Sequence, residues 1–270
     1  MRKLLFFIIL ILTFNLKASA QVAGISASKL TTFNAYTISL HHLEVEPSIS
    51  WMSSQSAFND HGKRHFYSAN HDSLITSRTL FFRGTYSPFK NLEIGTLITS
   101  DLSSLSFGVK YLFFDNKKLA ASFIYGGNWS GLYSPVLKPG FVPGPETRVS
   151  SYAGGFALTR QFSENLSWDS DLQYQNSFSG GRSFQNDYFV DSELGYYVFN
   201  HQLQLVGGFA YHYQNTKTAG QEAYSLIFNP GVTIETGKSY LIVLYAPIPL
   251  IGKNSAIYHG INLAFTMDVE

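Results

Sequence analysis

The sequence contains no cysteine among its 270 residues, which excludes a disulfide-stapled fold and a lipid-modified N-terminal cysteine. Charged residues are also scarce, at 14%, where a soluble domain carries about 25%. The net charge of +1 argues against a nucleic-acid partner. After residue 20 no apolar run is long enough for a membrane-spanning helix. The strongest, residues 240–251, falls short of about 20 residues and is interrupted by Pro247 and Pro249.

The first 20 residues have the pattern of a secretory signal peptide. Arg2 and Lys3 supply the positive charge, residues 4–14 form the apolar run, and Ala18-Ser19-Ala20 is a small-residue cleavage site. The apolar run is too short to span a membrane as a helix. We therefore expect residues 1–20 to be removed and Gln21 to begin the mature chain.

Residues 166–175 (LSWDSDLQYQ) alternate between apolar and polar side chains. Leu166, Trp168 and Leu172 fall on one face of an extended strand, and Asp169 and Asp171 fall on the other. The same alternation recurs along most of the chain, which is also rich in aromatic residues at 16%. An apolar outer face and a polar inner face, repeated in strand after strand, are typical of a transmembrane β-barrel.

The strand pattern predicts an all-β, antiparallel up-and-down barrel of about twelve strands over residues 43–270. Short links follow the even strands and mostly longer links follow the odd ones, as in outer-membrane barrels with a periplasmic N-terminus. Residues 21–42 are less regular, and they fit a periplasmic tail, an extension of the first strand or a partial plug equally well. The predicted strands are residues 43–52, 76–86, 92–99, 105–114, 119–128, 151–162, 166–175, 188–199, 202–213, 223–235, 239–248 and 257–267.

The inner face carries the candidate functional residues. Pairing residues 166–175 with 188–199 across a loop at 176–187 predicts Asp171 beside Glu193, with Asp169 below and Asp191 above. Two earlier strands place Arg83 and Lys110 on the inner face. One hypothesis is an acidic stripe opposite a sparse basic one, with a transverse field that selects solutes in a watery pore. The alternative is that these groups only solvate the interior, or pair as struts in a filled lumen.

Two other chemistries have weak signals. His61, His65 and His71 share one polar loop, but loop spacing fixes no coordination geometry, and we expect no metal and no cofactor. A lipid-modifying enzyme would need a serine beside a histidine on the outer wall. Ser170 and His259 have outward parity but lie on strands far apart in the chain, so we do not expect an enzyme.

Residues 43–51 (LEVEPSISW), a polar loop and residues 80–95 (LFFRGTYSPFKNLEIG) follow the signal peptide. In this pattern the chain resembles the transporter-type outer-membrane barrels grouped with meta-pathway phenol-degradation proteins. The resemblance implies passive uptake of small solutes, hydrophobic ones included, across a Gram-negative outer membrane. We expect outer-membrane lipids, a small-molecule solute and the barrel-assembly machinery as partners. The sequence departs from the family pattern in its last residues, Met267-Asp268-Val269-Glu270, which lack a terminal aromatic, so we expect the barrel-assembly signal at Phe265. A structural or interaction barrel with a filled lumen remains the alternative.

Overall fold

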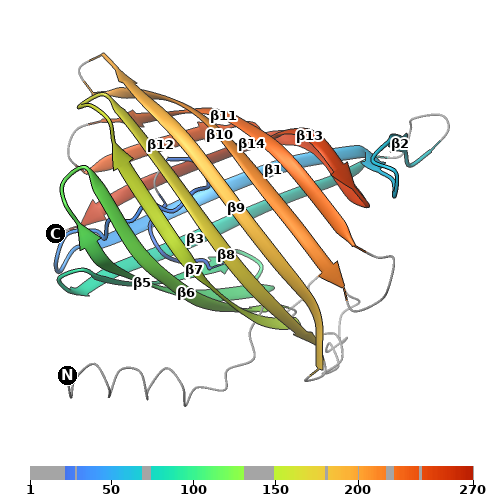
Figure 1. The fold of residues 1–270 in the computed structure, drawn as a ribbon, viewed down its shortest axis with the longest axis horizontal. Helices are drawn as coiled ribbons and strands as arrows, with labels where there is room; N and C mark the ends of the chain where they lie inside the picture. The colour runs from blue at the N-terminus through green and yellow to red at the C-terminus, as the bar shows by residue number, and fades with distance from the viewer. Residues whose placement is uncertain are drawn as a thin grey trace.

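The computed structural model describes residues 22–27, 29–68, 74–130, 149–179, 182–199, 201–216, 222–236 and 239–269. They form a closed antiparallel β-barrel (Figure 1). The strands are β1 (Leu43–Phe58), β2 (Arg64–Phe66), β3 (Ile75–Phe89), β4 (Leu92–Thr99), β5 (Ser104–Asp115), β6 (Leu119–Ser130), β7 (Val149–Gln161), β8 (Leu166–Ser179), β9 (Arg182–Val198), β10 (Leu203–Thr216), β11 (Ala223–Glu235), β12 (Tyr240–Tyr245), β13 (Ile248–Lys253) and β14 (Ser255–Val269).

Twelve strands make the wall, as the sequence predicts. The short β2 pairs only with β1, beyond the rim, and β12 and β13 follow one another along a single position of the wall. From β3 to β11 each strand pairs with the next in sequence, and β14 pairs with β12. β1 closes the cylinder against β14, with Leu43 opposite Val269. Among the described residues, no helix is long and apolar enough to cross a membrane.

The two faces of the wall differ as the alternation predicts. On β8 the side chains of Leu172 and Tyr174 are 54% and 42% exposed, whereas Asp169 and Asp171 are 1% and 2% exposed. Exposed large apolar residues occur on strands all around the barrel. A closed cylinder of strands with an apolar outer surface is how β-proteins span a membrane.

Several predicted boundaries are wrong: β1 runs to Phe58 and not to residue 52, and β3 runs to Phe89 and not to residue 86. Two further differences bear on the site. The polar stretch expected as a loop at 176–187 is mostly strand, because β8 continues to Ser179 and β9 begins at Arg182. Polar side chains pair across it, as where Asn176 Nδ2 donates to Asn186 Oδ1 at 2.7 Å. The strand expected at 239–248 breaks after Tyr245, and Pro247, which has no N–H group, lies in the break.

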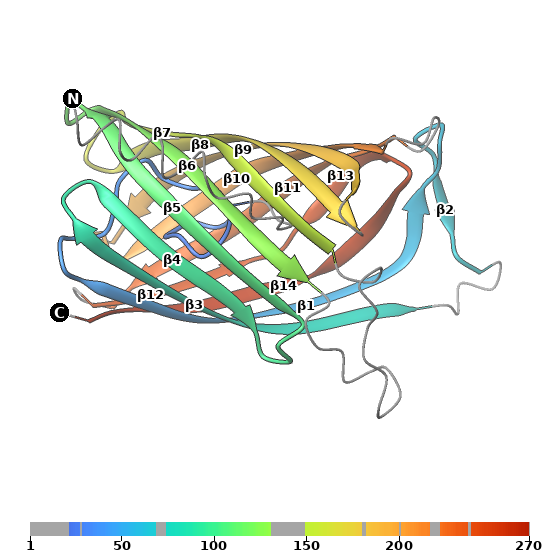
Figure 2. The ribbon, with the colours of Figure 1, turned by 90° about the horizontal axis from the view of Figure 1, so that it is seen from below.

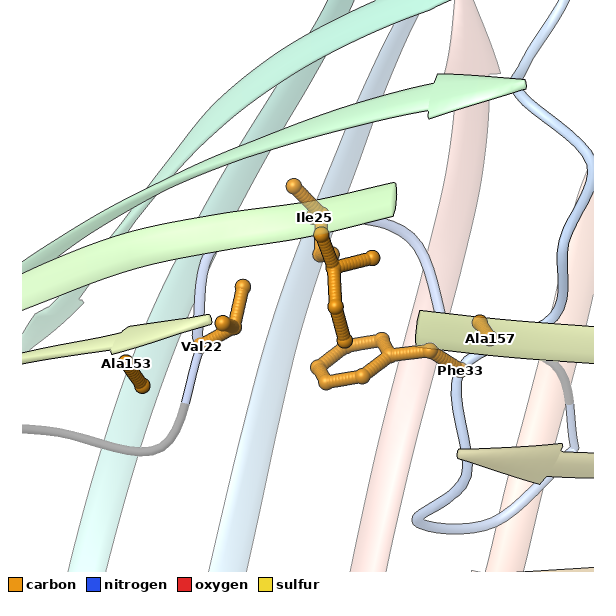
Figure 3. Packing of buried hydrophobic residues seen from close by; sticks show 6 residues of the cluster. Val22, Ile25, Phe33, Ala153 and Ala157 are labelled. Carbon is orange, nitrogen blue, oxygen red and sulfur yellow. The ribbon is translucent and has the colours of Figure 1, made fainter. Parts of the chain in front are cut away.

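The lumen is occupied by the chain itself. Residues 22–27 and 29–38, hereafter the inner segment, run without helix or strand inside the cylinder, where Figure 2 shows them as a dark blue trace. Val22, Ile25 and Phe33 pack in one buried cluster with Ile124, Ala153 and Ala157 of the wall (Figure 3). Further along, Leu30 packs against β10 and β12, and Ala35 against β5 and β6.

Candidate functional site

The candidate site is the inner face of the barrel together with the inner segment. Small residues on the wall make room for the segment. A Cβ built on Gly95 would overlap the carbonyl oxygen of Gly24, and one on Gly108 would overlap that of Ala23. The inward positions of β6 and β7 are also mostly small, and the buried Ala120, Ser122, Ser151, Ala153 and Ala157 are among them. On this side of the barrel the wall therefore meets the segment backbone to backbone.

Glu193 of β9 binds the middle of the inner segment. Its carboxylate accepts hydrogen bonds from the backbone N–H groups of Leu30 at 3.0 Å, Thr31 at 2.7 Å and Thr32 at 3.2 Å. The Thr31 hydroxyl donates to the same carboxylate at 2.9 Å. The Glu193 side chain is 1% exposed. A buried carboxylate that accepts several backbone N–H groups fixes the path of an otherwise irregular chain.

The two aspartates of β8 hold the segment on either side of this point. Asp171 accepts the Phe33 N–H at 2.9 Å, and Asp169 pairs with the ammonium group of Lys29. Thr159 of β7 links the two elements, because its hydroxyl donates to Asp169 at 2.5 Å and accepts the Ala35 N–H at 2.9 Å. Burial lowers the pKa of Lys29 to about 8.

Lys110 of β5 and Glu93 of β4 form a second anchor. The Lys110 ammonium donates to the carbonyl oxygens of Ser26 at 3.0 Å and Tyr36 at 2.9 Å, and lies 3.5 Å from the Glu93 carboxylate. Glu93 in turn accepts the N–H groups of Ser26 at 2.6 Å and Ile38 at 3.1 Å. Lys110 and Glu93 are both fully buried. This pair therefore holds Ser26 close to Tyr36 and Ile38.

Arg83 of β3 forms a third anchor. Its guanidinium pairs with the carboxylates of Glu44 and Glu46 on the neighbouring β1 and donates to the Ile25 carbonyl oxygen at 2.9 Å. The sequence predicts Arg83 on the inner face, but these contacts lie along one wall and not across the lumen. Arg83, Lys110, Asp169, Asp171 and Glu193 thus all contact the inner segment.

The predicted register of the acidic cluster is wrong by two residues. Asp169 lies opposite Glu193, and Asp171 lies opposite Asp191. The sequence places Asp171 near Glu193 because it centres the turn within residues 176–187, whereas the turn lies between Ser179 and Arg182 and a bulge follows between Ser177 and Phe178. Asp191 is 5% exposed and borders a cavity beside the segment.

Sequence reasoning missed Lys29 and Glu93 as members of this site. Glu93 had a usable signal. It lies directly opposite Lys110 in the β4–β5 ladder, and the link between these strands is short enough to fix that register. Lys29 had none, because it lies in a segment without periodicity and its partner Asp169 is 140 residues away. The carboxylates Glu44 and Glu46 have the same inward parity as their partner Arg83 on the adjacent strand.

Among the described residues, cavities remain beside the inner segment, and two of them border its side chains. One, of about 220 Å³, is bordered by Lys29, Arg83, Glu44, Glu46 and Tyr245. The other, of about 320 Å³, lies behind β10, β11, β13 and β14 and is bordered by Thr31. The lumen is therefore narrowed by the segment without being packed solid.

The signals for other chemistries do not converge. Within the described residues, no group of three or more His, Asp or Glu side chains is arranged to hold a metal ion. His61 lies 3.7 Å from Asp60 in an exposed turn, and His71 lies outside the described residues. Ser170 is on β8 and His259 on β14, strands that are not neighbours in the sheet.

Comparison with known proteins supports the fold. No family model and no curated protein matches the chain. An outer-membrane channel from Pseudomonas putida F1 is similar in structure, with 11% identity over 89% of this chain and 100% of that one, at a TM-score of 0.64. The KdgM porin in complex with disordered oligogalacturonate aligns at 10% identity over 84% and 99%, and the CymD monoaromatic hydrocarbon channel at 7% over 86% and 90%, each with a TM-score of 0.45.

The protein is thus a transmembrane β-barrel of the outer-membrane type. Its fold is that of the outer-membrane channel from Pseudomonas putida F1, and at this identity the likeness concerns the fold alone.

Proposed function

We propose that this protein is a channel for small solutes across the outer membrane, with the inner segment as its constriction. The observation that carries the proposal is the nature of the contacts around the segment. Its backbone is held largely by hydrogen bonds to wall carboxylates and to Lys110, groups that water or ions can also satisfy. Charged inner walls of this kind tune which solutes enter a pore.

The second candidate is a structural or interaction barrel with a permanently filled lumen. The burial of Lys110, Glu93 and Glu193 favours it, since a buried charge that loses its partner is strongly unfavourable. Under that function the ion pairs act as struts, and partners bind at the outer loops. The two candidates differ in one measurable property, which is whether ions cross the folded barrel.

Single-channel conductance in a planar bilayer tests the proposal. We compare the chain that begins at Gln21 with a chain that lacks residues 22–38, each refolded and checked for heat-modifiable migration. A channel predicts small, salt-dependent conductance for the first and a larger one for the second. Silence of the shortened barrel would exclude a conducting lumen and leave the filled-lumen function.

Ion selectivity gives an independent test on the full chain. Replacing Asp169 and Asp171 by Asn removes two inward charges, so a conducting lumen should become less cation-selective. The control is Asp115→Asn, which removes an exposed carboxylate at the end of β5. Equal selectivity in both variants would mean that the β8 aspartates do not line the ion path.

A further inference from the structure

The wall has a seam where one pair of neighbouring strands is not hydrogen-bonded. β12 pairs with β14 from Tyr240 to Tyr245, and β13 pairs with β11 on its other side. Over the described residues, which include both strands in full, no ladder joins β13 to β14. The first half of β14 pairs with β1 alone. The seam lies toward the end of the barrel away from the C-terminus (Figure 1).

Two prolines explain the seam. The N–H of Ala246 donates to Pro230 of β11 at 3.2 Å, so Ala246 faces β11. Because successive N–H positions of an extended chain point to opposite edges, the nitrogens of Pro247 and Pro249 face β14, and neither carries a hydrogen. After Pro249, a bulge at Leu250 shifts the register between β13 and β11. The sequence thus leaves this edge without the donors that a ladder needs.

An apolar cavity lies directly behind the seam. Pro249 of β13 and Ala256 and Tyr258 of β14 border it on the seam side. Ile227 of β11, the ladder partner of Pro249, and Phe189 of β9 also border it. Its volume is about 320 Å³. An apolar cavity of about 150 Å³ is enough to bind benzene. The space behind the seam therefore accommodates a molecule of one or two rings.

A few polar groups border the same cavity. His212 of β10 is held in place, because its Nε2 lies 2.9 Å from the Asp187 carboxylate and its ring stacks on Phe189 at 4.4 Å between centroids. Asn229 of β11 and Asp191 of β9 lie on the same inner surface and are almost completely buried. Mostly apolar walls with a small number of fixed polar groups are characteristic of small-molecule sites.

We propose that this cavity binds a small, mainly apolar molecule of one or two rings, and that the seam between β13 and β14 is a lateral portal between the cavity and the lipid. The cavity supplies a substrate class for the proposed channel, and the seam supplies a route. Transport through the seam rests on the proposed channel function, whereas binding in the cavity can be measured whether or not the barrel conducts. Thr31 of the inner segment borders the cavity. The segment therefore forms one wall of the binding site as well as the constriction.

Because the chain has no native cysteine, a single introduced thiol reports on the site. Ala210 faces the cavity from β10, and the probe is the labelling rate of Ala210→Cys by N-phenylmaleimide in liposomes, with toluene as competitor. At a toluene concentration about nine times its Kd, an occupied site slows labelling about tenfold. The control is Ser50→Cys, which borders the other cavity and should not be protected. Absence of protection at Ala210→Cys would overturn the binding site.

The portal is tested by restoring the missing donors. The double substitution Pro247→Thr and Pro249→Thr, in the Ala210→Cys background, supplies N–H groups to the edge facing β14. Labelling by the lipid-partitioning maleimide should slow, while labelling by a charged methanethiosulfonate from the aqueous end should not. Unchanged maleimide labelling in a folded double variant would overturn the portal.

The outcomes separate this inference from the proposed function. A barrel that conducts no ions but is protected by toluene would exclude the ion-conducting channel and retain the binding site. A barrel that conducts ions but whose Ala210→Cys thiol is not protected by toluene would retain the channel and exclude the binding site.

Discussion

Gly95 on the wall and Gly24 on the inner segment meet backbone to backbone, with the Gly24 carbonyl oxygen in the space that a side chain at Gly95 would fill. Gly24 itself has a φ of +84°, a conformation that favours glycine. The contact is formed by atoms that cannot rotate out of the way. It therefore offers a way to displace the segment while leaving its charges untouched.

Gly95→Ala should loosen the inner segment. Overpacking of this kind costs about 1–3 kcal/mol, and movement of the segment away from the wall relieves it. We expect larger single-channel conductance than in the unmodified chain. Gly84→Ala on the adjacent β3 is the matched control, because a Cβ there has open space. Equal conductance in the two variants would contradict a constricting role for the segment.

Glu193→Gln should free the middle of the segment. The substitution keeps the shape of the side chain but removes the charge that strengthens its hydrogen bonds to Leu30, Thr31 and Thr32. Hydrogen bonds to charged groups contribute about 1.5–3 kcal/mol each. Hydrogen exchange of these three amides should therefore accelerate by about tenfold or more.

The control for this measurement is Glu235→Gln. That carboxylate accepts the Tyr197 hydroxyl at 2.6 Å and has no contact with the inner segment among its described hydrogen bonds. In the Glu235→Gln variant, hydrogen exchange of the amides of residues 30–32 should be as slow as in the unmodified chain. Protection that survives Glu193→Gln would show that apolar packing alone holds the segment.

Arg83→Met should destabilise the barrel strongly, because it leaves Glu44 and Glu46 close together without a cation. Removing one partner of a buried ion pair costs about 3–5 kcal/mol. Adding Glu44→Gln and Glu46→Gln should recover much of the loss in the free energy of unfolding, measured by denaturant titration in liposomes. Arg78→Met is the control on the same strand, since Arg78 is exposed and lies over the Trp51 ring at 4.9 Å. Similar losses for Arg78 and Arg83 would argue against a buried triad.

Leu172→Arg tests which face of the wall meets lipid. Leu172 points outward near the middle of β8, and an arginine at the midplane of a barrel wall costs about 2–4 kcal/mol. Phe162→Arg, in the short link between β7 and β8, should cost only about 0–1 kcal/mol near the interface. The free energy of unfolding in liposomes measures both. Equal losses would mean that Leu172 does not lie at membrane depth.

The sequence alone predicted the wall well for a physical reason. The side-chain period of a strand is two, so a residue such as Asp169 or Leu172 is assigned to the inner or outer face by its position in the alternation. The neighbouring strand need not be known. Short links then fix the strand order and the count of twelve. What parity does not fix is how far two strands slide. The sequence therefore paired Asp171 with Glu193 in place of Asp191, because it predicted neither the position of the turn nor the bulge between Ser177 and Phe178.

The inner segment was harder to predict. Its backbone follows neither a helical nor a strand period, and its contacts join residues as distant as Leu30 and Glu193, 163 positions apart. Nothing local in the sequence records such a contact. The small inward residues of β5 to β7 did carry a signal. A wall with Gly108, Ala153 and Ala157 on its inner face leaves space, and the segment fills part of it.

Closure of the cylinder between β1 and β14 sets an order on biogenesis. The last ladder cannot form before Val269 has been synthesised, since that residue lies opposite Leu43. The main anchors of the inner segment lie on β3 to β9, all made earlier. An open, curved sheet can therefore wrap around the segment before its edges meet. A chain truncated ahead of β14 would keep its lumen contacts but present two unpaired edges, and we expect it to aggregate.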